Sequence, residues 1–216
     1  MKKSFIIKIL LVLMFAATAP LSLFAAAETH DGFYFNLMLG GGYDQSTIQY
    51  SDSSDVDYSG LGTMFKIKLG GAPVEDFILY GVFGYYDLEG PKVTVGSESA
   101  TFNNLYLVYA ELGGGFCYYF MPDNYFVSTE LTVTSLTVGN DDAVNENDKS
   151  NGSDIGWALT LSLGKEWWVS DNWGVGVAVV ATVGSVAAGE GIVNEENKND
   201  KILHTYLGVA FTATYN

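Results

Sequence analysis

The chain has 216 residues and a formal net charge of −15, with 10 Lys and Arg against 25 Asp and Glu. This acidity excludes nucleic acid as a partner, because phosphate binding needs clustered cations. Only 16% of the residues are charged, which is low for a soluble surface, and the 25 glycines and 14% aromatic residues favour strands over helices.

Residues 1–27 have the three parts of a secretory signal peptide. Lys2 and Lys3 supply a positive start, a short apolar run follows, and the small residues Ala25 and Ala27 form a cleavage motif. The alternative is an N-terminal membrane anchor, but the apolar run is short for a spanning helix. The sequence therefore predicts a cleaved signal peptide.

Cleavage before Glu28 leaves residues 28–216 as the mature domain, which we expect to be a single barrel. The leader takes three lysines with it, so the formal charge changes from −15 to −18 (−15 − 3). The single cysteine, Cys117, excludes an intramolecular disulfide and is expected to be an inert inward residue.

In the mature chain, apolar residues recur at every second position, which is the period of a strand with two different faces. In the first such segment, Phe33, Phe35 and Leu37 share one face, whereas Asn36 and Met38 share the other. The predicted strands are residues 33–43, 61–70, 77–86, 106–120, 127–134, 157–166, 174–184 and 203–215. The third of these is apolar on both faces, so its alternation does not assign an inner side.

Short and long connections alternate between these eight segments. The short ones are residues 71–76, 121–124 and 170–172, and the long polar ones are roughly 44–59, 87–101, 139–155 and 185–200. Short periplasmic turns and long external loops are typical of bacterial outer-membrane barrels. The sequence predicts an all-β fold, an eight-stranded antiparallel up-and-down transmembrane β-barrel located in the outer membrane.

A secreted, soluble cup with eight alternating strands is the alternative architecture, with its apolar face directed inward. Here the polar face is mostly Gly, Ser, Thr and Ala, which suits a narrow lumen better than a water-exposed exterior. Aromatic residues also gather beside the short turns, as in the girdles of membrane barrels. The predicted girdle residues are Trp167, Trp168, Trp173, Tyr118 and Tyr125.

Four segments carry a family resemblance, namely "GFYFNLMLGGGYD", "KLGGAPVEDFILYGVFGYY", "LGKEWWVSDNWGVGV" and "YLGVAFTATY". Together they resemble the small outer-membrane β-barrel proteins of Gram-negative bacteria, the class that includes the OmpA transmembrane domain, OmpX and OmpW. The resemblance implies a monomer surrounded by outer-membrane lipid and lipopolysaccharide, inserted by the barrel-insertion machinery and needing no cofactor. Family members usually end in an aromatic residue, whereas here Asn216 follows Tyr215.

Alternation directs several ionisable side chains into the predicted lumen, where an isolated charge would be costly. The expected lumen charge network comprises Lys66, Lys68, Glu111, Glu130, Glu166 and His204. It resembles the interior salt-bridge networks of the family. Two interpretations remain open, a structural plug and a gate along a thin aqueous path. The narrowness of an eight-stranded barrel favours the plug, while the many inward glycines leave room for the path.

Catalysis and metal binding have weak support. His30 and His204 lack a recognised spacing to a nucleophile, so we expect no enzyme activity. The acidic segment "NDDAVNENDKSNGSD" does not fit a calcium-binding EF-hand loop, because Lys149 and Ala158 fall where ligands are required. We expect no catalytic residue and no specific metal site.

The sequence therefore predicts a small porin-like or structural outer-membrane protein with a charged, largely filled lumen. The alternative function is that of a surface adhesin, or a host- or ligand-binding barrel, which would act through its long acidic external loops.

Overall fold

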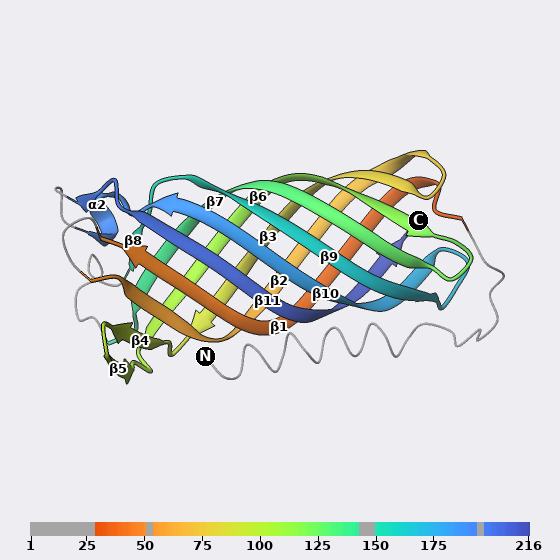
Figure 1. Ribbon diagram of the computed structural model, residues 1–216. Helices are drawn as coiled ribbons and strands as arrows, with labels where there is room; N and C mark the ends of the chain where they lie inside the picture. The colour runs from red at the N-terminus through yellow and green to blue at the C-terminus, as the bar shows by residue number, and fades with distance from the viewer. Residues whose placement is uncertain (1–28, 51–53, 143–149, 194–196) are drawn as a thin grey trace.

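Each long strand pairs antiparallel with the next along the chain, and the last pairs with the first, so the sheet closes into a barrel (Figure 1). The computed structural model describes residues 29–50, 54–142, 150–193 and 197–216. The predicted signal peptide, residues 1–27, lies outside the described residues. The eight barrel strands are β1 (Gly32–Gln49), β2 (Val56–Val74), β3 (Phe77–Glu89), β6 (Leu105–Phe120), β7 (Tyr125–Asn140), β9 (Gly156–Trp168), β10 (Trp173–Ala187) and β11 (Lys201–Tyr215).

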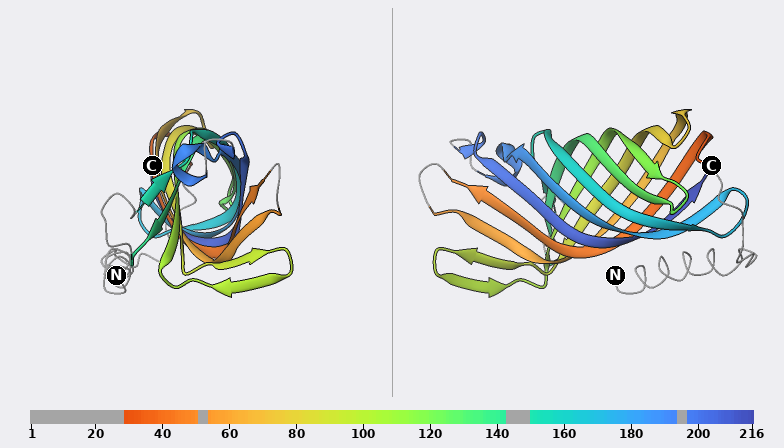
Figure 2. Two further views of the ribbon diagram at one scale, coloured as in Figure 1. Left: turned by 90° about the vertical axis from the view of Figure 1, so that its left-hand side faces the viewer. Right: turned by 45° about the vertical axis from the view of Figure 1, so that its right-hand side comes forward.

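The closed ring runs β1-β11-β10-β9-β7-β6-β3-β2 and returns to β1 through the β1–β2 pairing. Viewed end-on, the strands form one tube (Figure 2). Closure gives every barrel strand two hydrogen-bonded neighbours, and this is what a sheet needs in lipid, where water cannot satisfy an open edge. The predicted eight-stranded up-and-down barrel is confirmed.

The two faces of the wall differ in the way the alternation predicts. Outward side chains are apolar and exposed, such as Leu61 at 84% and Phe211 at 69%, while Met64 and other inward side chains are fully buried. This arrangement is that of a membrane barrel, whose exterior meets acyl chains. The ambiguous third strand is now assigned: Tyr80 and Tyr86 of β3 face the lumen.

The long-loop end is more ordered than the sequence indicated. Strand structure continues into each of the four segments predicted as loops: β1 reaches Gln49, β3 reaches Glu89, β7 reaches Asn140 and β10 reaches Ala187. Beyond the membrane the outer face can be polar, so the hydrogen-bond ladder continues without the apolar alternation that revealed the strands. The remaining elements at this end are β4 (Lys92–Val95), β5 (Glu98–Thr101), β8 (Ser150–Gly152) and the short helix α2 (Gly189–Ile192).

The opposite end is closed by three tight turns. Asp76 lies in the β2–β3 turn with φ of 62°, and Asn124 lies in the β6–β7 turn with φ of 55°. Asp and Asn tolerate this left-handed backbone better than most residues, which suits them to such turns. Among the described residues, none lies in a helix long and apolar enough to cross a membrane.

Neighbouring strands approach each other closely at Gly113. A Cβ added to Gly113 would overlap the Leu131 carbonyl oxygen and lie 2.6 Å from Thr132 Cα, whereas one added to Gly81 would meet nothing closer than 3.8 Å. We expect Gly113→Ala to destabilise the barrel by about 1–3 kcal/mol, the usual cost of overpacking. The measurement is the urea midpoint of the barrel refolded in vesicles. Gly81→Ala is the matched control, and equal midpoints for the two variants would contradict the prediction.

Candidate functional site

The centre of the lumen holds a chain of four alternating charges. Lys66 Nζ lies 2.6 Å from Glu111 Oε1 and 2.6 Å from Glu130 Oε2, and Lys68 Nζ lies 2.6 Å from Glu130 Oε1. Their exposed fractions are 1–2%. Two cations and two carboxylates make this central ion cluster neutral, which offsets the cost of removing each charge from water.

The cluster ties together strands that are not neighbours. Lys66 and Lys68 stand two residues apart on β2, so both point inward, while their partners Glu111 and Glu130 come from β6 and β7. Strand β3 separates β2 from β6 in the ring. The ion pairs therefore cross the lumen instead of following one stretch of wall.

Hydroxyl groups complete the hydrogen bonding of the cluster. Thr160 Oγ1 accepts from Lys66 Nζ at 3.2 Å, Tyr80 OH donates to Glu130 Oε1 at 3.3 Å, and Thr132 Oγ1 donates to Glu111 Oε2 at 3.2 Å. A further hydrogen bond links Tyr86 OH and Thr182 Oγ1 at 2.6 Å. Buried charges that are both paired and hydrogen-bonded in this way stabilise a single arrangement of the interior.

Glu166 is held by a different means. It is 1% exposed and accepts hydrogen bonds from Thr212 Oγ1 at 2.8 Å and Thr214 Oγ1 at 2.7 Å on one carboxylate oxygen, and from Tyr119 OH at 3.3 Å on the other. No ion pair with Glu166 occurs among the residues that the structure describes. Three hydroxyl donors take the place of a cation, so Glu166 stands apart from the central ion cluster.

His204 also has a separate setting, on the long-loop side of the cluster. Its Nε2 lies 3.3 Å from both carboxylate oxygens of Asp44, and its ring stacks on Tyr109 with centroids 3.9 Å apart. Tyr86 meets the His204 ring edge-on at 5.2 Å and so links this layer to the cluster below it. The alternation missed Asp44, although continuing the even-numbered inward face of β1 by one step would have included it.

Buried side chains occupy both ends of the lumen. At the short-turn end, fully buried His30 stacks on Tyr119 at 3.5 Å, lies 4.9 Å from the Trp168 ring, and bonds Asn124 Oδ1 through Nε2 at 2.8 Å. At the long-loop end, a set of apolar inward side chains is at most 3% exposed. These are Ile48, Leu88, Leu107, Leu136, Val186 and Ile202.

The aromatic residues predicted as a girdle separate into two groups. Trp167, Tyr118 and Tyr125 are outward and about half exposed, and Trp173 packs against the Tyr215 ring. Trp168 instead points to the lumen side, against His30. The sequence contained the signal, because Trp168 follows inward Glu166 by two residues.

No group of three or more His, Cys, Asp and Glu side chains in the described ranges is placed to hold a metal ion. Cys117 is buried and unbridged. The described lumen residues include paired charges, hydroxyl groups and stacked rings, while some buried polar atoms, such as His30 Nδ1 and Asn36 Oδ1, have no hydrogen-bond partner.

Comparison with known proteins gives similarity in fold. No family model matches the chain, and no curated protein sequence matches it. Among solved structures, it is similar to outer membrane protein AlkL (11% identity, TM-score 0.46, covering 89% of this chain and 93% of that one) and to Neisserial surface protein A (13%, 0.44, 85% and 97%). The outer membrane protease OmpT from Escherichia coli is also similar (8%, 0.43, 86% and 96%).

The barrel's own features determine its class. A closed eight-stranded wall, an apolar exterior, short turns at one end and longer extensions at the other are the features of a bacterial outer-membrane β-barrel. The protein is an outer-membrane β-barrel.

Removing one charge from the central ion cluster tests its importance. Lys66→Met leaves Glu111 buried without a cation, so we expect a loss of about 3–5 kcal/mol in unfolding free energy. The double variant Lys66→Met, Glu111→Gln removes the unpaired charge and should recover most of this loss. Urea unfolding in vesicles, followed by tryptophan fluorescence, compares the two. Equal losses would mean that side-chain packing, and not charge pairing, decides stability.

Proposed function

We propose that the protein is a structural, porin-like outer-membrane barrel whose lumen is closed because side chains fill it. The observation that carries this proposal is the central ion cluster lying between two closed ends. His30, Tyr119 and Trp168 fill the periplasmic mouth, and Ile48 and Ile202 belong to the apolar layer at the external end. An ion passing through the lumen would have to displace the side chains at both ends and the central ion cluster between them.

The proposed role is non-catalytic. Both histidines are buried in stacked contacts, His30 with Tyr119 and His204 with Tyr109, and neither lies at an open rim where a substrate could reach it. The partners that accompany this role are outer-membrane lipid, lipopolysaccharide and the barrel-insertion machinery, with the barrel acting as a monomer and without a cofactor.

Single-channel recording in a planar bilayer tests the closed lumen. We expect the refolded wild-type barrel to give no discrete openings, because the paired charges and both end layers exclude water. Folding is verified by heat-modified gel mobility, and a large porin inserted in the same way proves that the assay detects openings. Discrete wild-type openings that change in a Glu111→Ala, Glu130→Ala double variant would overturn the proposal and make these charges a gate.

Surface binding is the second candidate function, and a projecting hairpin favours it. β4 pairs with β5 and with the start of β2, and the hairpin leans away from the barrel at the long-loop end (Figure 2). All of Glu98–Thr101 is exposed, as are the apolar side chains of Val95 and Phe102. Exposed apolar groups beside acidic ones on a rigid support are suited to contact with another surface.

Replacing residues 92–101 with a short Gly-Ser turn tests this second function. If the hairpin binds, bacteria that display the shortened barrel should attach to cultured host cells several-fold less than bacteria that display the wild type. Surface amounts are matched by antibody against another external segment. Unchanged attachment would remove the hairpin as a binding element.

A further inference from the structure

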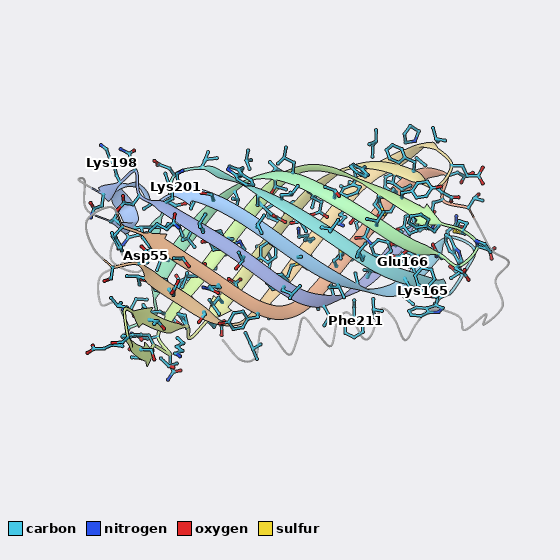
Figure 3. All side chains as sticks on the ribbon, in the orientation of Figure 1. Asp55, Lys165, Glu166, Lys198, Lys201 and Phe211 are labelled. Carbon is cyan, nitrogen blue, oxygen red and sulfur yellow. The ribbon has the colours of Figure 1, made fainter. Side chains whose placement is uncertain are left out.

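One cation interrupts the apolar exterior near the short turns. Among the described barrel strands, the charged residues at outward positions are Asp57, Asp87, Glu89, Lys165 and Lys201. Four of them lie toward the long-loop end, and Lys165 alone lies in the periplasmic half. Figure 3 places Lys165 at the short-turn end and Lys198 and Lys201 at the opposite end.

The Lys165 side chain is oriented toward the membrane surface. Its Nζ donates a hydrogen bond to the Asp123 carbonyl oxygen at 2.8 Å, and lies 4.2 Å from the Tyr125 ring centroid and 5.9 Å from that of Trp167. A lysine near the end of a membrane strand extends its charged group to the interface while its stem stays in the apolar region. An ammonium group has three N–H donors, so two remain for another acceptor.

An apolar hollow of about 500 Å³ adjoins Lys165 on the outer wall. Its floor includes Phe126, Gly164 and Ala178, which pair with one another across three neighbouring strands. These are inward positions, so no side chain projects from them into the hollow. The outward side chains around it are Phe120, Val127, Leu163, Val177, Val179 and Val209. The hollow therefore lies within the apolar belt, with Lys165 and Tyr125 on its lining.

We propose that this hollow and Lys165 form a binding site for an anionic phospholipid of the periplasm-facing leaflet. An acyl chain occupies the apolar hollow, and the phosphate accepts hydrogen bonds from Lys165 Nζ beside the Tyr125 and Trp167 rings. Charge complementarity and depth select this occupant. Within the described barrel strands, Lys165 is the one outward cation of the periplasmic half, and it lies where that leaflet's headgroups lie. Lipopolysaccharide occupies the opposite leaflet, near the long-loop end.

Native mass spectrometry of the whole barrel tests the proposal. The barrel is refolded in vesicles of equal phosphatidylglycerol and phosphatidylcholine and then released in mild detergent. We expect one phosphatidylglycerol to remain bound in preference to phosphatidylcholine. Excess inorganic phosphate should not displace it, because free phosphate lacks the acyl chain that fills the hollow. Release by inorganic phosphate would overturn the phospholipid assignment.

Two pairs of variants separate the headgroup from the acyl chain. Lys165→Gln should reduce retained phosphatidylglycerol about five-fold or more, as expected for one lysine at an anionic interface, while Lys201→Gln at the other end should not. Val179→Trp fills the hollow and should also reduce retention, whereas Val133→Trp, an outward position on β7 outside the hollow, should not.

The folded fraction of every variant is measured first by heat-modified gel mobility, and only the folded band is compared. Equal retention by Lys165→Gln and wild type, or equal retention of the two phospholipids by the wild type, would overturn the proposal. These readouts do not depend on whether the lumen conducts, so the lipid site and the closed lumen fail or succeed separately.

Discussion

The narrowness of an eight-stranded ring controls the rest of this molecule. Lipid cannot satisfy open backbone groups, so the sheet must close, and closure at eight strands leaves an interior that side chains can fill. Charges directed into that space lose water and must find partners within reach. Lys66 does so by lying 2.6 Å from two carboxylates at once, and Glu166 does so by accepting from three hydroxyl groups.

Strand identity and sidedness could be predicted from the sequence because membrane and lumen impose opposite chemistry on alternate residues. That alternation placed Lys66, Lys68, Glu111 and Glu130 inside the barrel. It could not specify which carboxylate meets which lysine, since partners on β2, β6 and β7 depend on the relative stagger of strands that are far apart in the ring. It also could not locate the strand ends beyond the membrane, where the outer face becomes polar and buried apolar side chains such as Ile48 and Ile202 point inward instead.

The contacts that sequence reasoning missed share a physical cause. His30 precedes the first strand, Asp44 lies beyond the predicted end of that strand, and Tyr80 and Tyr86 belong to the strand that is apolar on both sides. Each lies where the alternation of apolar and polar residues is weakest. Tyr86 lies between Lys66 of the central ion cluster and the His204 ring, and His30 stacks on Tyr119 at the short-turn end. Aromatic rings therefore line the lumen together with the charged residues.

The origin of these contacts along the chain bears on how the barrel is assembled. The central ion cluster draws only on β2, β6 and β7, whereas Asp44 and His204 come from β1 and β11, which meet at the seam where the ring closes. A partly inserted sheet containing the first five barrel strands already carries both lysines and both of their carboxylates. The histidine–aspartate contact, by contrast, requires the two ends of the sheet to join. Closure of the seam is thus the step that brings together the most distant polar groups in the sequence.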